Sequence, residues 1–196
     1  QLMCSFVYLQ GSELKNRVVF YDFSEIGKNV PNRLVGGFDD EFQGDMVPRV
    51  TYMGDPYSCA FSGKALTFFS SRNLASPELV EQRAIDERID SVFYSDEYAA
   101  AIVRNTNGEY GSRLEVYKKD GTHVLRKEFN FEYTNADLDG DLIILYNEDS
   151  CRIYNMSGTE KLDAAFDFPV SKIRKGRFPG TLVVTGPQQM RELKLH

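Results

Sequence analysis

Apolar and polar residues alternate with a period of two along most of this chain, in short runs that are rich in β-branched and aromatic residues. Clusters of turn-forming residues, such as Gly54-Asp55-Pro56 and Asp120-Gly121, interrupt the runs at intervals of about 8 to 12 positions. Strands give a period of two, whereas helices give a period near 3.6. The pattern therefore predicts an all-β chain of short antiparallel strands.

The alternation predicts roughly eighteen strands in five groups of three or four. The residues from Glu78 to Ile89 also fit a helix, because they are rich in Glu and Arg and follow Ser76-Pro77. A strand is preferred there, because the equivalent position in the repeats is a strand. The strands are expected at 3–10, 17–23 and 33–38; at 49–53, 57–61, 65–69 and 79–85; at 89–94, 98–103, 113–118 and 124–131; at 136–138, 142–146, 151–155 and 161–168; and at 170–174, 181–185 and 190–195.

The stretch from Leu114 to Phe168 contains one sequence pattern twice. Leu-Glu-Val-Tyr at 114–117 returns as Cys-Arg-Ile-Tyr at 151–154. The interval is 37 residues for each matched pair, so the register holds over a whole repeat. The matched pairs are Tyr117 and Tyr154, Gly121 and Gly158, Thr122 and Thr159, Phe129 and Phe166, and Phe131 and Phe168.

Four short strands in a period of about 40 residues are typical of a β-propeller blade, which needs a neighbour on each side to bury its faces. A β-sandwich remains the structural alternative, but it does not explain the fixed interval. The predicted fold is one β-propeller region over 1–196, a partial ring of about four to five four-stranded blades. The blades are expected at 1–45, 46–88, 89–132, 133–169 and 170–196.

The first and the last group of predicted strands are each one strand short of a complete blade. The chain starts at Gln1 within a predicted strand, and we expect the first unit to lack its innermost strand and the last unit its outermost. These pieces would not complete one shared blade. We therefore interpret the chain as the C-terminal part of a larger propeller. Its uncovered sheet faces should associate with a second copy or with the missing N-terminal blades.

The chain is acidic, with a formal net charge of −6 and a pI near 5.0, which argues against nucleic acid as a partner. A membrane-spanning run of about 18 apolar residues and a signal peptide are both missing from the pattern, so an anchor would lie outside this sequence. Cys4, Cys59 and Cys151 lack the spacing of a zinc site or a disulfide framework, and we expect them to be small buried residues.

Two acidic motifs are candidates for cation binding. Asp137-x-Asp139-x-Asp141 with Glu148 matches four acidic positions of an EF-hand calcium loop, but Leu142 replaces the glycine that the sharp turn requires. The alternative is a turn at Gly140 between two strands. The second motif is a cluster that fits either a cation site or a solvated loop, formed by Asp39, Asp40, Glu41 and Asp45.

A basic cluster near the C-terminus fits either an anion-docking site or one exposed strand face. It consists of Lys172, Arg174, Lys175 and Arg177. Aromatic residues near strand ends are candidates for either partner contacts or packing between sheets. We expect Tyr110 to be the most exposed of them. They are Tyr94, Tyr98, Tyr110, Tyr133 and Tyr146.

The sequence offers no assembled catalytic set. The only histidines are His123, expected to be exposed, and His196, and no serine lies in a nucleophile-elbow motif. No catalytic, metal or cofactor residue is therefore assigned, and no cofactor is expected. Asn155-Met156-Ser157 matches a glycosylation pattern but falls at a strand end. The absence of tryptophan disfavours a quinoprotein-type propeller.

The segment from Asp90 to Leu195 resembles an uncharacterised family of Gram-positive bacterial proteins. The resemblance is carried by F-x-F-E-Y-T-N at 129–135 and C-R-I-Y-N-x-S-G at 151–158, and it is looser over the first 90 residues. The family pairs an N-terminal transmembrane helix with an extracytoplasmic, WD40-like propeller. The resemblance thus implies a membrane-anchored, extracytoplasmic protein and brings no catalytic residues with it.

These observations favour a non-catalytic module that binds a protein, peptide or glycan at the bacterial cell surface. An alternative is a propeller hydrolase or lyase that uses carboxylates and tyrosines in the central channel. A structural spacer without a ligand is the third reading. The sequence does not identify the binding residues or the partner.

Overall fold

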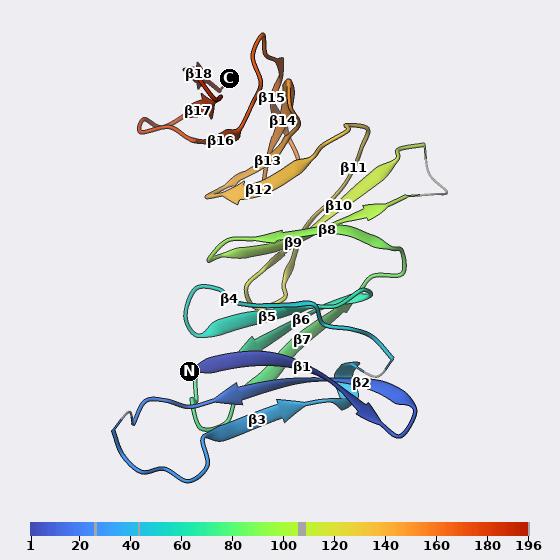
Figure 1. Cartoon of the computed structure of the whole chain (residues 1–196). Helices are drawn as coiled ribbons and strands as arrows, with labels where there is room; N and C mark the ends of the chain where they lie inside the picture. The colour runs from blue at the N-terminus through green and yellow to red at the C-terminus, as the bar shows by residue number, and fades with distance from the viewer. Residues whose placement is uncertain (26, 43, 106–108, 196) are drawn as a thin grey trace.

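The computed structural model describes residues 1–25, 27–42, 44–105 and 109–195, and it arranges them in five antiparallel sheets stacked in an arc (Figure 1). The first sheet contains β1 (Leu2–Gln10), β2 (Glu13–Tyr21) and β3 (Leu34–Phe38), followed by the short 3-10 helix η1 (Asp40–Phe42). The second contains β4 (Arg49–Tyr52), β5 (Tyr57–Phe61), β6 (Ala65–Ser70) and β7 (Glu78–Ala84). The third contains β8 (Ile89–Tyr94), β9 (Tyr98–Arg104), β10 (Ser112–Lys118) and β11 (His123–Phe129). The fourth contains β12 (Asn135–Asp139), β13 (Leu142–Tyr146), β14 (Ser150–Asn155) and β15 (Glu160–Ala165). The fifth contains β16 (Lys172–Lys175), β17 (Thr181–Thr185) and β18 (Met190–Lys194).

Each sheet is a meander in which strands that follow one another in the sequence pair in space. The first strands of neighbouring sheets lie on the same side of the arc, where β1 contacts β4 and β8 contacts β12. Meanders that radiate from a row of first strands are the architecture of a β-propeller. The predicted fold class is confirmed, and the stretch at 78–84 is a strand rather than a helix.

Three expectations about the strands are wrong in detail. The first hairpin turns at Gly11-Ser12 alone, because Gly11 adopts a positive φ of 66° and β2 resumes at Glu13. β11 and β15 end before Phe131 and Phe168, which leave the strands to pack against the core. The first sheet has its inner strand, since β1 lies beside β4, so its unfilled position is the outer one beyond β3.

The 37-residue repeat is reproduced in the hydrogen bonds of the third and fourth sheets. The Lys118 N–H donates to the Thr122 carbonyl at 2.8 Å, and the Asn155 N–H donates to the Thr159 carbonyl at 3.0 Å. A register shift falls at Val116/Tyr117 in one sheet and at Ile153/Tyr154 in the other. Such equivalent bulges bend both outer strands at the same place and identify the two sheets as repeats of one blade.

The core lies between the sheets rather than inside any one of them. Phe20 and Phe69 pack between the first and second sheets, and Phe68 and Tyr117 between the second and third. Apolar clusters also join the third sheet to the fourth and the fourth to the fifth. Fully burying one large apolar side chain contributes about 1.5–3 kcal/mol, so these shared faces hold the arc together.

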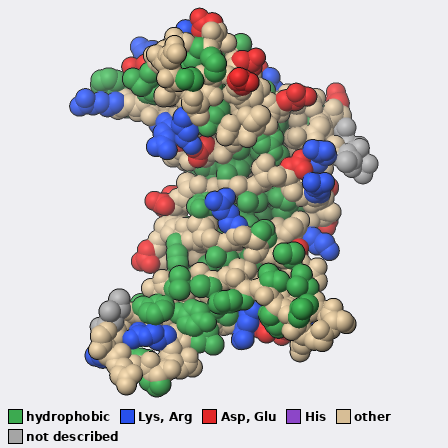
Figure 2. Space-filling view, in the orientation of Figure 1, with side chains coloured by type: hydrophobic (Ala, Val, Ile, Leu, Met, Phe, Trp, Pro, Cys, Tyr) green, Lys and Arg blue, Asp and Glu red, His purple; other side chains and the backbone are tan. Residues whose placement is uncertain are grey.

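The two ends of the arc present different faces. On the first sheet, Leu2, Phe6 and Tyr8 alternate with the inward-facing Met3 and remain 46%, 47% and 38% exposed. Figure 2 shows hydrophobic side chains gathered over this end. On the fifth sheet, the exposed strand positions opposite the buried Leu182 and Val184 are mainly polar: they are Thr185, Arg174, Glu192 and Lys194, with Met190 as the apolar exception.

Among the described residues, no helix is long and apolar enough to cross a lipid bilayer. The three cysteines are free thiols, with Cys59 and Cys151 fully buried and Cys4 half-buried. Burial raises the pKa of Cys151 to about 12 and that of Cys59 well above its usual range. The expectation of small buried residues is met by Cys59 and Cys151.

Candidate binding site between the fourth and fifth sheets

The acidic and basic clusters that the sequence analysis treated separately meet across the fourth and fifth sheets. Asp137 and Asp139 pair with Ile144 and Leu142, which face the fifth sheet, so alternation turns both carboxylates toward β16. Lys172 Nζ donates to Asp137 Oδ2 at 2.6 Å, and the Lys175 N–H donates to Asp139 Oδ2 at 2.8 Å. We call these contacts, together with the ion pair between Lys175 and Asp141, the β12–β16 clasp.

The clasp accounts for the calcium-like motif. Lys175 lowers the pKa of Asp141 by its hydrogen bond, as expected for a carboxylate held in an ion pair. Glu148 follows β13, whose five residues span roughly 17 Å, so it lies at the far end of the sheet from the turn at Asp141. The geometry favours the turn alternative over the calcium loop.

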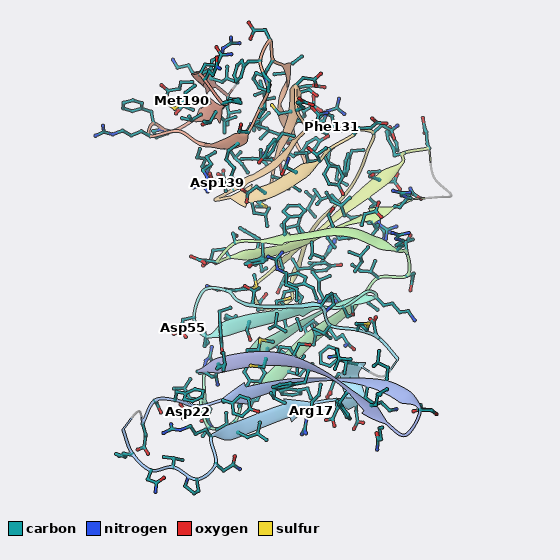
Figure 3. The ribbon with its side chains drawn as sticks, in the orientation of Figure 1. Arg17, Asp22, Asp55, Phe131, Asp139 and Met190 are labelled. Atoms are coloured by element: carbon teal, nitrogen blue, oxygen red, sulfur yellow. The ribbon has the colours of Figure 1, made fainter. Side chains whose placement is uncertain are left out.

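A cavity of about 600 Å³ opens beside the clasp, under the loop between β16 and β17. Figure 3 labels Asp139 near the end of β12 that lies below this loop. The walls come from the β12–β13 turn, the end of β14, β15, the β16–β17 loop and the end of the chain. The charged and apolar residues of the lining are Asp141, Lys161, Lys175, Arg177, Leu142, Phe178, Pro179 and Leu195.

Positive charge exceeds negative charge in the cavity. Three cationic side chains face one carboxylate, and that carboxylate is already paired with Lys175. Lys and Arg side chains gather over the β16–β17 loop in Figure 2. In a chain of net charge −6, this cavity is a local cationic site. The cavity contains Lys175 and Arg177 of the predicted basic cluster. Lys161 was missed because it lies in β15 and only the packing of the two sheets brings it to the cavity, and Phe178 was missed although it directly follows Arg177.

Four of the five candidate tyrosines are at least half-buried and pack in the core. Tyr146 is 3% exposed, and Tyr94 stacks on Phe61 with ring centroids 5.9 Å apart. Tyr98 and Tyr133 pack against the cluster between the third and fourth sheets, and the Tyr133 hydroxyl hydrogen-bonds to the Ser91 hydroxyl at 2.9 Å. Tyr110 is exposed, as expected; residues 106–108 of its loop lie outside the described residues.

The acidic loop after β3 is fastened to its neighbours. Asp45 accepts hydrogen bonds from the Met46 and Lys64 N–H groups at 2.9 and 3.1 Å, and Asp39 lies 3.8 Å from Arg17 Nε. Phe42, at the end of η1, is 2% exposed and packs in the first core cluster. Asp45 thus ties this loop to the second sheet, and Asp39 ties it to β2 of the first sheet.

The remaining candidates also have structural partners. His123 is exposed and its Nε2 lies 3.1 Å from Glu115 Oε2, whereas His196 lies outside the described residues. The Asn155 side-chain oxygen accepts hydrogen bonds from Ser157 and Thr159 and thereby shapes the β14–β15 turn. In the described part of the chain, no group of His, Cys, Asp and Glu side chains is arranged to hold a metal ion.

One ionic network was missed by the sequence analysis. Arg113 and Glu115, with side chains only 7% exposed, lie on the face of β10 that is turned toward the second sheet. Arg113 holds Glu87 through two hydrogen bonds of 2.5 Å and Glu115 through one of 2.8 Å. The hydrogen bonds from Arg113 lower the pKa of Glu87. The available signal was two charges at alternate positions of an otherwise apolar strand.

The stacked meanders and their shared apolar faces define a β-propeller arc. The family model for a family of unknown function, DUF5711, matches residues 1–195, and the chain belongs to that family. The match covers nearly the whole chain and includes the first 90 residues, where a looser resemblance was expected. A comparison with curated proteins finds no match.

Solved structures show the same fold at low sequence identity. Hsv2 of Kluyveromyces marxianus is 12% identical with a TM-score of 0.51, over 92% of this chain and 52% of its own. A region of HIRA is 11% identical with a TM-score of 0.50, over 73% of this chain and 49% of its own. BBS1N, solved in complex with ARL6DN, is 11% identical with a TM-score of 0.50, over 92% of this chain and 60% of its own. This chain therefore spans about half the length of the solved structures that it matches.

Proposed function

We propose that this chain is a non-catalytic propeller module that binds a protein, peptide or glycan. The observation that carries the proposal is the cationic cavity beside the β12–β16 clasp, which has the size of a ligand site and is open to solvent at a loop end of two sheets. Loops held by a rigid scaffold are where propellers and other β folds place their binding residues. The clasp supplies that rigid support.

We also propose that the module works outside the cytoplasmic membrane, tethered by an anchor that lies beyond this sequence. This placement rests on the resemblance carried by the tracts at 129–135 and 151–158. Digestion of intact cells with protease, followed by immunodetection of the full-length protein, tests it. Protection of the module in intact cells and its cleavage in lysed cells would contradict the placement.

Binding by the purified chain to peptide and glycan arrays tests the function. We expect retention on a subset of spots and loss of that retention in a Lys161→Glu/Arg177→Glu variant. Lys64→Glu/Arg72→Glu is the matched control, because it reverses two exposed charges in the second sheet and its flanking loop. Mass spectra of the retained ligands should be unchanged after incubation.

Each alternative function gives a different result. A change in ligand mass would support the enzyme that uses channel carboxylates and tyrosines. Equal retention by the wild type and both variants would show that the ligand does not bind in the cavity. No retention on any spot would favour the structural spacer and would contradict the proposal.

A further inference from the structure

Two cations in the cavity form no close ion pair with the described part of the protein. Lys175 is paired with Asp141, but within residues 1–25, 27–42, 44–105 and 109–195 no carboxylate oxygen lies within 4.0 Å of Lys161 Nζ or of the Arg177 guanidinium nitrogens. Elsewhere the chain pairs many of its cations internally, as in the Arg152–Asp163 and Arg191–Asp167 bridges of the same two sheets. The two cations are therefore available to an anionic ligand.

An apolar wall stands beside these cations. Phe178 is 63% exposed, and Pro179 and Leu195 line the same cavity. A large exposed aromatic side chain next to an arginine is the combination that protein-binding sites favour. A small inorganic anion would contact the cations and leave this wall uncovered, whereas a ligand with an anionic group beside an apolar one would contact both.

Hydrogen bonds brace the loop that carries Arg177 and Phe178. The Gly176 N–H donates to the Thr181 carbonyl at 2.8 Å, and the Thr181 hydroxyl donates to the Phe178 carbonyl at 2.8 Å. The Leu195 N–H donates to the Gly180 carbonyl at 2.7 Å and ties the loop to the end of the chain. A preformed site loses less conformational entropy when a ligand binds.

We infer that this cavity binds an acidic peptide segment in which an Asp or Glu carboxylate lies next to an apolar side chain. The carboxylate contacts Lys161 and Arg177, and the apolar side chain packs on Phe178 and Leu195. The planar guanidinium of Arg177 suits a carboxylate, which it can hold through two parallel hydrogen bonds. This inference rests on the proposed binding function and specifies the class of its ligand.

Fluorescence polarisation with two synthetic peptides tests the inference. One peptide contains two glutamates flanked by leucine and phenylalanine, and the other replaces both glutamates with glutamine. We expect the acidic peptide to bind the wild-type chain at least about tenfold more tightly than the glutamine peptide, because charge-assisted hydrogen bonds are lost in the latter. Its affinity should fall as salt is raised from low to physiological concentration.

Variants locate the site. Lys161→Gln and Arg177→Gln should each weaken binding of the acidic peptide by about tenfold, and Phe178→Ser should weaken both peptides. Arg72→Gln, which removes an exposed cation of the second sheet's flanking loop, should leave the affinity unchanged. Unchanged circular dichroism spectra and unfolding midpoints in all four variants show that the fold is intact.

Several outcomes overturn the inference. Equal binding of the two peptides would exclude a carboxylate-specific site while leaving the proposed binding function in place. Displacement of the peptide by inorganic phosphate at a similar concentration would exclude a peptide ligand in favour of a simple anion. Failure of both peptides to bind would reject this ligand class, and the array experiment would then decide on the binding function independently.

Discussion

Arg113 and Glu115 are opposite charges buried on the face of β10 that packs against the second sheet. Tyr117, two positions further on, lies in the apolar cluster on the same face. A buried charge is tolerated only where its partners replace the lost hydration. Glu87 and Glu115 supply those partners for Arg113, so each member of the network depends on the others.

Replacing Arg113 with alanine should destabilise the protein by about 3–5 kcal/mol, because Glu115 would remain buried without its closest cation. Arg126→Ala is the control. Arg126 contacts the same carboxylate at 3.3 Å, but its side chain is 60% exposed, so its loss should cost about 0–1 kcal/mol. Urea unfolding of both variants measures the free energies, and similar values for the two would contradict the role of burial.

The network should also make stability depend on pH. The pKa of Glu87 is lowered in the folded protein, so its stabilising contribution is present above the unfolded-state value near 4.5 and is lost as the pH falls through the folded-state value. The stability difference between the wild type and Arg113→Ala should therefore shrink as the pH is lowered from about 5. A constant difference would show that Glu87 is not coupled to Arg113.

The sequence predicted β10 from its alternation but not this network. Arg113 and Glu115 occupy alternate positions, which fits an exposed face as well as a buried one. The choice between a buried and an exposed face depends on Glu87, which lies 26 positions before Arg113 in the connection that precedes β8. Only the arrangement of neighbouring sheets brings that carboxylate to the arginine.

At the level of elements, Gly121 and Gly158 mark equivalent turns between the third and fourth strands of their sheets. Their φ angles are +82° and +80°, a region that side chains disfavour. A Cβ on Gly121 would also lie 2.6 Å from Glu81 Cβ in the second sheet, so the turn packs directly against the neighbouring blade. The turn therefore sets both the connection between two strands and the close packing of one sheet against the next.

Gly121→Ala should cost more stability than the same change at Gly11. Both glycines have a positive φ, which gives a penalty of about 1 kcal/mol, but nothing lies within 4 Å of a Cβ at Gly11. The additional clash at Gly121 should add a further ~1 kcal/mol or more. Thermal unfolding of the two variants gives the comparison, and equal losses would mean that the backbone angle alone matters.

Strands and turns were predictable because their signals are local. Leu142–Tyr146 and Tyr57–Phe61 were predicted with the bounds that they have, from alternation and flanking turn residues. The β12–β16 clasp was not, because Asp137 and Lys172 are 35 positions apart in different sheets. Each half of the clasp was visible as a charge cluster, yet their pairing depends on how one blade packs on the next.

For the whole molecule, the difference between the two end faces determines where association occurs. The uncovered positions of the first sheet include Leu2, Phe6 and Tyr8, whereas those of the fifth sheet include Thr185 and Glu192. Apolar faces of this kind are normally covered in a soluble protein. The first sheet is therefore the expected contact surface with another sheet.

The chain should self-associate through its first sheet. Phe6→Asp, which places a charge on that apolar face, should shift the protein toward the monomer, whereas Val183→Asp on the fifth sheet should have little effect. Light scattering over a range of concentrations measures the mass. A monomeric wild type at high concentration, or an equal response of the two variants, would contradict this assignment.

The sharing of core clusters between neighbouring sheets has a consequence for folding. A middle sheet loses two interfaces when it opens, but an end sheet loses one, so the free energy of local opening should rise from the ends of the arc toward the third sheet. The chain then behaves as a short row of coupled units rather than as one all-or-none body. Ligand bound between the fourth and fifth sheets would bridge the single interface that holds the C-terminal sheet, and it would slow the exchange of amide hydrogens there first.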